Sequence, residues 1–401
     1  MKRTKRGGHS KERGSALTMV VSGLVILLLL GSGLLGLDLQ SQLLAARTAA
    51  GIAARSAADA GLTKALFEMN EMLQVEPWDD SVLPESVNER LLNCDATFSY
   101  AVTGDMGNGY VIESVGKSGW VERRVGSSLR VQGLFEYAVF AQGDIDLAAA
   151  AAVDWYNYDE DDENLQIGSH SVVPGAIELK NRSMINGDVV VGVGGDPAIV
   201  ITDNGAIITG RAYAMVGRHH VPRITVPGWL ASLPSGGTIR NDTTISSSGK
   251  YDEIDLKHGK EIEVGGNVAL YIVGDVVLGN SAQIMVGGDD DTSLILFIGG
   301  DYEGKSGSSL NNKTRDPGKL KVYGLESCNY MRFKNGTELY GAIYAPNADV
   351  TFDNSADAYG SVVARRFVQR NSAAFHYDAS LRDVDVDDDG VRFVVGRWSE
   401  E

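Results

Sequence analysis

Three aspartates near the end of the chain have the spacing of a calcium-binding loop. Asp385, Asp387 and Asp389 alternate with other residues and are followed by Gly390, which matches the opening D-x-D-x-D-G of such loops. Calcium takes about six to eight oxygen ligands, and this spacing presents several carboxylates around a turn that glycine permits. The twelfth position, where a calcium loop carries a bidentate acid, is Gly396. A calcium site and a solvated acidic linker are both open interpretations, and no other cofactor is expected.

The chain has two cysteines, Cys94 and Cys328. Outside the cytoplasm they could form one disulfide that ties an early segment to a late one, and the alternative is two unrelated buried thiols. Neither has a C-x-x-C neighbour, so the sequence does not support a metal or redox motif.

The remaining candidates for chemistry are weaker. The adjacent pair His219 and His220 would point in different directions on an extended chain, which favours an ordinary loop, and His376 lies between aromatic residues, which favours a packed, hydrogen-bonded side chain. The acidic runs 159–163 and 289–291 are expected to be solvated loop tips. No G-x-S-x-G, H-E-x-x-H or P-loop signature occurs, so the sequence predicts a protein that is not an enzyme.

The elements that must position these residues begin with an apolar stretch at 15–37, which carries no charge and no proline. A helix needs about 20 apolar residues to cross a membrane, so this stretch can span one. Six basic residues and one acidic residue precede it, which predicts a basic cytoplasmic leader over 1–14 and a single-pass, N-in orientation in the inner (cytoplasmic) membrane. A secretory signal peptide is the competing interpretation, but the run is too long and lacks an A-x-A cleavage pattern.

The rest of the chain is then expected in the periplasm or at the cell surface. The whole chain carries a net charge of −17, and without residues 1–14 the charge is −22. Nucleic-acid backbones are bound by clustered basic side chains, so no nucleic-acid partner is expected.

A second helical segment follows without interruption. No proline occurs before Pro77, and residues 38–75 read as an alanine-rich amphipathic spine that continues the membrane helix. Two apolar stripes have the three/four spacing of a helix, and they comprise Leu39, Leu43, Ala46, Ala50, Ala53 and Ala57, then Leu62, Leu66, Met69 and Leu73.

The start of the chain resembles PilX-type minor pilins and pseudopilins. The resemblance rests on R-G-S-A-L-T-M at 13–19, the apolar run, and A-A-D-A-G-L at 57–62. It implies that a prepilin peptidase cuts after Gly14, which makes Ser15 the mature N-terminus, and that other pilins or pseudopilins are partners. Major pilins have a glutamate at the position of Met19 here, and its replacement favours a subunit that starts or caps a filament.

Residues 76–133 are expected to form a small antiparallel β region. A short helix is predicted over 85–93, followed by strands over 97–102, 109–115 and 120–131, where apolar and polar residues alternate.

From residue 134 to 381 short apolar runs are punctuated by glycine, of which the chain has 48. A Gly-Asp turn between apolar strands recurs at Asp144, Asp188, Asp275 and Asp301, at irregular intervals. Irregular rungs of a right-handed parallel β-helix tolerate such spacing, and a β-sandwich is the competing fold. The proline-containing segment 211–251 is predicted to be a loop excursion.

The end of this region resembles a bacterial polymer-forming, bactofilin-like β-helical domain that occurs fused to PilX-type N-termini. The resemblance rests on G-A-I-Y-A-P-N-A at 341–348, Y-G-S-V-V-A at 359–364 and F-H-Y-D-A-S-L at 375–381. An acidic tail over 382–401 with a closing strand over 392–398 is expected after it.

The sequence therefore predicts an α+β protein with a long N-terminal helix, a small antiparallel sheet and a β-helical head. The favoured function is a non-enzymatic, minor pilin-like assembly or tip subunit of a type IV pilus or type II secretion pseudopilus. The alternatives are a membrane-tethered carbohydrate-active β-helix enzyme and a surface adhesin or scaffold unrelated to pili.

Overall fold

The computed structural model describes residues 15–73, 75, 77–157, 164–289, 291–334, 336–384, 386, 388 and 390–400. The chain divides into two units. The helix–sheet unit comprises the residues up to Arg130 and those from Phe393 onward, and the head unit comprises Val131–Arg392.

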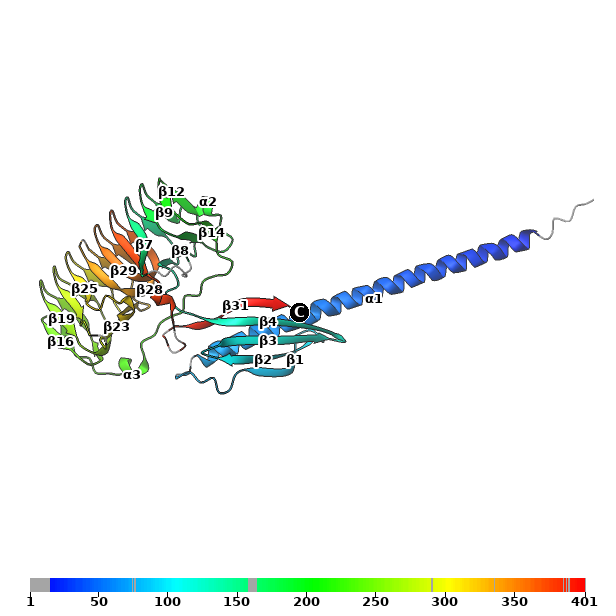
Figure 1. The fold of residues 1–401 in the computed structure, drawn as a ribbon, viewed down its shortest axis with the longest axis horizontal. Coiled ribbons are helices and arrows are strands. Elements are labelled where there is room, and N and C mark those ends of the chain that lie inside the picture. The colour runs from blue at the N-terminus through cyan, green and yellow to red at the C-terminus, as the bar shows by residue number, and fades with distance from the viewer. Residues whose placement is uncertain are drawn as a thin grey trace, which may run out of the picture. The chain divides into compact units, whose positions relative to one another are not determined.

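The helix–sheet unit is built on one uninterrupted helix, α1 (Ser15–Met72) (Figure 1). Its interior has no proline and is rich in leucine and alanine, which are strong helix formers. The prediction that the apolar stretch and the spine form one helix is confirmed, and the helix ends at Met72, a few residues before Pro77.

A five-stranded sheet covers the C-terminal part of α1. Its strand order is β1-β2-β3-β4-β31, and neighbouring strands from β1 to β4 are antiparallel. The strands are β1 (Glu85–Arg90), β2 (Thr97–Asp105), β3 (Gly109–Ser118), β4 (Val121–Gln132) and β31 (Arg392–Glu400). The small antiparallel sheet and the closing strand are thus confirmed.

The short helix predicted over 85–93 is wrong, because this segment forms the edge strand β1. Glu85 to Arg90 pair with β2, with a register shift between Ser86 and Glu89. Asn88 sits at this irregularity with φ of +53°, a left-handed conformation that asparagine tolerates better than most residues. The backbone hydrogen bonds supplied by β2 outweigh the weak local preference for a helix.

The head unit consists mainly of short strands. Those before the long connection are β5 (Val139–Ala141), β6 (Ile145–Leu147), β7 (Ala152–Asn157), β8 (Gln166–Ser169), β9 (Ile177–Leu179), β10 (Met184–Ile185), β11 (Asp188–Val191), β12 (Ile201–Asp203), β13 (Ile207–Ile208) and β14 (Ala212–Ala214), with the short helix α2 (Pro197–Val200).

Those after it are β15 (Thr238–Ile239), β16 (Thr243–Ile245), β17 (Gly249–Tyr251), β18 (Glu253–Leu256), β19 (Glu261–Val264), β20 (Asn267–Ile272), β21 (Val276–Leu278), β22 (Gln283–Val286), β23 (Ser293–Ile298), β24 (Tyr302–Gly304), β25 (Ser309–Asn312), β26 (Leu320–Gly324), β27 (Tyr330–Phe333), β28 (Glu338–Phe352), β29 (Asp357–Gln369) and β30 (Ala374–Asp378), with α3 (Gly228–Ala231), η1 (Pro317–Lys319) and η2 (Ala379–Arg382).

These strands form one large, mostly parallel sheet in which a strand typically pairs with the third strand along the chain. Examples are β18 with β21, β21 with β24, and β20 with β23. Valine, isoleucine and leucine at alternate positions are buried in a continuous core between them. Parallel pairing at this interval is consistent with the predicted β-helix and argues against an antiparallel sandwich.

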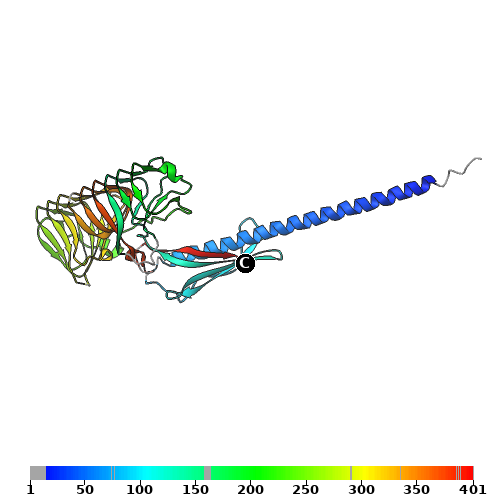
Figure 2. The ribbon, with the colours of Figure 1, turned by 45° about the horizontal axis from the view of Figure 1, so that its top comes forward.

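The coils of the head unit are not stacked in chain order. The long strand β29 pairs with both β5 and β6, and β30 pairs with β7, so the last coil lies on the first one. Figure 1 shows this as the teal of β7 beside the red of β29, with green strands beyond β7 and yellow strands beyond β28, and Figure 2 shows the same order from another side.

A connection over residues 215–237 joins the two stacks of coils. It is shorter than the predicted excursion over 211–251, because β14 and β15–β17 lie within that range. Met215 and Leu230 of the connection are buried in a second apolar cluster, and the Tyr344 hydroxyl donates to the Pro222 carbonyl oxygen at 2.5 Å. The connection is therefore a packed part of the head unit.

The recurring Gly-Asp turns are corners at which successive coils approach closely. The Asp275 carboxylate accepts from the backbone N–H of Asp301 at 2.8 Å, and the Asp301 carboxylate accepts from Asn329 and Tyr330 at 2.7 and 3.1 Å. A methyl group on Gly300 would lie 2.2 Å from a carboxylate oxygen of Asp275. Glycine thus allows the approach, and aspartate satisfies the N–H groups that the corner leaves unpaired.

Candidate assembly surface

The first part of α1 is an exposed apolar surface. From Leu17 to Leu37 its leucine, valine and isoleucine side chains are exposed, and the helix is long and apolar enough to cross a membrane. An apolar surface of this size is stable only when lipid or another protein covers it.

Beyond residue 37 the helix remains exposed for about four more turns. Leu39, Leu43, Leu44 and Ile52 are each more than half exposed. The predicted stripe that began at Leu39 is therefore not buried against the chain's own sheet. Its members at 39–46 are available to another molecule.

Helix residues are fully buried against the sheet from Ala54 onward. Ala54, Ala57 and Ala58 are fully buried, and a methyl group on Gly116 of β3 would lie 2.0 Å from the Ala54 carbonyl oxygen and 2.4 Å from the Ala58 nitrogen. Gly116 therefore lets the strand backbone approach the helix backbone, much as small residues allow closely packed helices to touch.

The buried face of α1 against the sheet continues to the end of the helix. Leu62, Ala65 and Met69 are buried at helical spacing, and a methyl group on Gly61 would lie 2.3 Å from the Ser114 hydroxyl oxygen and 3.0 Å from a ring carbon of Phe98. The last part of α1 and the sheet thus share one apolar core.

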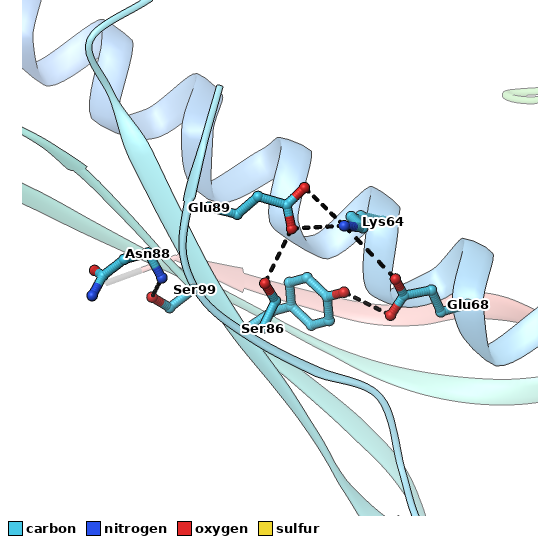
Figure 3. A network of polar contacts seen from close by, with 7 residues as sticks. Lys64, Glu68, Ser86, Asn88, Glu89 and Ser99 are labelled. Atoms are coloured by element: carbon cyan, nitrogen blue, oxygen red, sulfur yellow. Dashed lines mark hydrogen bonds and ion pairs between the residues drawn. The ribbon is translucent and has the colours of Figure 1, made fainter. Parts of the chain in front are cut away.

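A polar network fixes the edge strand β1 to the helix (Figure 3). The Lys64 ammonium donates to both carboxylate oxygens of Glu89 at 2.6 and 2.8 Å and lies 3.8 Å from Glu68. The Tyr100 hydroxyl donates to Glu68 at 2.6 Å, and the Ser86 hydroxyl donates to Glu89 at 3.0 Å. These charge-assisted contacts join α1, β1 and β2 at one place.

The network also shifts the ionisation of its members. The hydrogen bond from Lys64 lowers the pKa of Glu89, and the same bond raises the pKa of Lys64. Burial, followed by the hydrogen bond to Glu68, raises the pKa of Tyr100. At neutral pH the lysine and Glu89 are therefore both charged and Tyr100 is neutral.

The C-terminal strand β31 is held by the helix as well as by β4. The Asn70 side-chain amide donates to the Phe393 carbonyl oxygen at 3.1 Å, and its carbonyl oxygen accepts from the Phe393 N–H at 2.8 Å. The Phe393 ring packs against Trp78 and Tyr110. The Asn70 side chain thus makes the two backbone hydrogen bonds to Phe393 that a neighbouring strand would otherwise make.

Two arginines line the flank of the helix. Arg47 lies 5.1 Å from the ring of Trp120 and Arg55 lies 5.0 Å from the ring of Trp398, both as cation–π contacts. Trp120 is 75% exposed, so this tryptophan extends the exposed surface of the helix–sheet unit.

The processing residues predicted from the sequence lie at the start of α1. Gly14 is outside the described residues, whereas Ser15 is the first residue of the helix. Met19, at the position where major pilins have glutamate, is 75% exposed on the helix surface. Cleavage after Gly14 stays a prediction.

The predicted calcium ligands Asp385, Asp387 and Asp389 are outside the described residues, so that site stays a prediction. Among the residues that the structure describes, no group of three His, Cys, Asp or Glu is arranged to hold a metal. Asp388 forms an ion pair with Lys321 at 3.3 Å. Cys94 is exposed and Cys328 is buried, and both are free thiols in the structure.

The histidines lie as predicted. His219 is in the connection, and its ring packs against Tyr137 and Phe140. His376 stacks on Tyr359 and contacts the Asp154 carboxylate. Asp289 and Asp291 are exposed, whereas residues 159–163 are outside the described part of the chain.

The sequence did not predict the polar network around Lys64 or the two hydrogen bonds between Asn70 and Phe393. Lys64 and Glu68 are four residues apart on a helix, which is a visible signal. The contact of Glu89 with Lys64 could not be predicted, because residues 85–93 were expected to form a helix and not the edge strand β1. Nothing in the sequence links Asn70 to Phe393.

A family model described as a domain of unknown function, DUF7305, matches residues 225–384, within the head unit. No curated protein matches the chain. The ice-binding protein of the Antarctic ascomycete Antarctomyces psychrotrophicus is a similar solved structure with 11% identity, and the match covers 62% of this chain and 98% of that chain at a TM-score of 0.28. The competence-associated pilin ComZ of Thermus thermophilus is 14% identical, with 88% and 97% covered and a TM-score of 0.26. The PilX-type and bactofilin-like resemblances stay predictions.

Proposed function

We propose that this chain is a non-enzymatic, minor pilin-like subunit that carries a parallel β-helical head on a membrane-inserted helix. The observation that carries the proposal is the division of α1. Its first part is exposed and apolar, its middle part presents an uncovered apolar stripe, and its last part is built into a sheet.

This division suits a helix whose environment changes twice along its length. Lipid or neighbouring helices cover residues 15–37, neighbouring helices cover the stripe that includes Leu39 and Leu43, and the chain's own sheet covers the helix from Ala54 onward. Burial of exposed leucines supplies the free energy of assembly, at about 25 cal/mol per Å² of apolar surface. The lack of an acid at Met19 favours a place at the tip or start of a filament over repeated shaft positions.

In this proposal the leader is cytoplasmic, the helix spans the inner membrane, and the head lies in the periplasm or at the cell surface. A type IV pilus and a type II secretion pseudopilus both suit these features. The head is a presented module, and its acidic surface keeps it soluble.

N-terminal sequencing of the membrane form tests the proposal. In cells with an active prepilin peptidase the chain should begin at Ser15, and in matched cells without the peptidase it should keep the leader. The variant Gly14→Val should keep the leader in both cells. A leader retained by the unaltered chain in cells with the peptidase would refute the pilin-like role.

A further inference from the structure

The connection over residues 215–237 covers an apolar face on the outside of the coils of the head unit. In Figure 1 it passes from β14 to α3, which lie near opposite ends of the stack of coils. Its side chains Val221, Ile224 and Val226 pack on an apolar cluster that is separate from the core between the strands. We propose that the connection is an acid-sensitive cover of this outer face, and that His170 makes its attachment depend on pH.

The covered face is a row of residues that the strand register aligns across the coils. Members of the row alternate with residues of the inner core, as Phe297 does with Leu296 and Ile298, so the row points outward. In the order of their pairing, its members include Tyr271, Phe297, Tyr323, Tyr344, Val363 and Phe140. We call these six residues the outer row. Every member after Tyr271 is at most 2% exposed, because other parts of the chain cover the row.

The connection follows the outer row and is fixed to it by hydrogen bonds. The Tyr344 hydroxyl donates to the Pro222 carbonyl oxygen at 2.5 Å, and Nε2 of His170 lies 2.8 Å from the His219 carbonyl oxygen. A carbonyl oxygen can only accept, so His170 carries a proton on Nε2 in this contact. The His170 ring also packs edge-on against Phe140 of the outer row, with ring centroids 4.8 Å apart.

The second ring nitrogen of His170 makes this contact sensitive to acid. Among the residues that the structure describes, His170 Nδ1 is buried and has no hydrogen-bond partner. A second proton would place a charged N–H group there without an acceptor. The groups that face the ring are Arg218 and His219 of the connection and Tyr137, whose ring packs on Phe140 and His219. Burial, together with the charge of Arg218, lowers the pKa of His170 and outweighs the opposite effect of its hydrogen bond to His219.

The direction of the pH effect follows from this lowered pKa. Above the ordinary histidine pKa of 6.5 the ring is neutral whether the connection is attached or detached, so the attachment is at full strength. As the pH falls below 6.5, the detached state takes up a proton that the attached state excludes. The attachment therefore weakens until the pH reaches the lowered pKa. At pH 5.0 the detached state can gain at most about 30-fold in population, the limit for a ring that stays neutral while attached.

Hydroxyl-radical footprinting of the full chain in micelles at pH 7.5 and 5.0 tests the proposal. Labelling of Tyr323 and Tyr344, normalised to the exposed Trp120, should rise about 3–30-fold at pH 5.0. The variant His170→Gln keeps a side-chain donor that does not titrate, so it should remove the response to pH. The matched variant His258→Gln alters an exposed histidine elsewhere in the head unit and should leave the response unchanged.

A second variant separates detachment from its dependence on pH. Tyr344→Phe removes the hydrogen bond to Pro222 and should raise labelling of Tyr323 by a similar factor at both pH values. Equal labelling of the unaltered chain at the two pH values would overturn the proposal, as would a response that persists in His170→Gln. An equal rise at Phe333, in the inner core, would show that the coils themselves unfold and would also overturn it. The result does not depend on the pilin-like role, because leader cleavage is measured separately.

Discussion

Gly116 allows the most direct test of how the helix is seated on its sheet. A methyl group there would lie 2.0 Å from the Ala54 carbonyl oxygen and 2.4 Å from the Ala58 nitrogen, and both atoms belong to the helix backbone. To restore an ordinary contact of 3.4 Å the two backbones must separate by about 1.4 Å. Overpacking of this kind costs about 1–3 kcal/mol, so Gly116→Ala should lower the free energy that holds the end of α1 on the sheet by that amount.

A matched control uses the same chemical change on the helix itself. Gly51 has nothing within 4 Å of a built methyl group, so Gly51→Ala should stabilise the helix by about 0.8–1.0 kcal/mol through propensity alone. The two variants should therefore differ by about 2–4 kcal/mol in the free energy that protects the end of α1.

Hydrogen–deuterium exchange of the full chain in micelles measures this difference in peptides that cover residues 54–72. Protection should fall by about one to two orders of magnitude in Gly116→Ala and rise in Gly51→Ala. Unchanged protection in Gly116→Ala would refute the close backbone contact, because no flexible side chain is present to absorb the methyl group.

Three further predictions concern contacts at other places. Lowering the pH should loosen β1, because the pKa of Glu89 is lowered by Lys64: the stabilisation is complete above its ordinary pKa of 4.5 and is lost as the pH falls through the folded value. Asn70→Ala should free β31 at a cost of about 1–3 kcal/mol, because the Phe393 N–H and C=O lose their partners, and exchange of residues 392–400 measures this. Asp301→Ala should lower the melting temperature of the head unit, because two N–H groups at a coil corner lose their acceptor.

Each of these has a control and a refuting result. Glu89→Gln should flatten the acid-side loss of protection in β1, and an unchanged pH profile would contradict the network. Asn70→Asp keeps one acceptor and should retain part of the exchange protection of β31. An equal loss of protection in Asn70→Asp and Asn70→Ala would contradict the role of the Asn70–Phe393 hydrogen bonds. Asp289→Ala alters an exposed turn and should leave melting unchanged, so an equal effect of Asp301→Ala would contradict the corner role.

The sequence predicted the parts of this fold that depend on local pattern. An uncharged apolar run without proline predicts one helix, and alternation at Phe98 and Tyr100 predicts a strand. The segment at Glu85 has no alternation, and only its pairing with β2 makes it a strand. The closeness of Arg332 and Arg370, which line the same two hollows of the head unit, could not be predicted either, because these residues are 38 positions apart in the chain and meet only through the register of the strands.

The stacking order of the coils has a consequence for how the chain completes its fold. The first coil, with β5, β6 and β7, gains its neighbours on one side only when β29 and β30 are present, more than 200 residues later in the chain. The antiparallel sheet likewise gains β31 only from residues 392–400, far from its other strands. Contacts of such long sequence separation form slowly, because the loop-closure entropy must be lost before they form. Both units therefore keep an unpaired strand edge until the residues after Asp357 have been added, so a chain that stops before that point leaves two open edges, where aggregation begins. The late segments Asp357–Gln369 and Arg392–Glu400 thus complete both units, so we expect the fold of each unit to depend on the last strands of the chain.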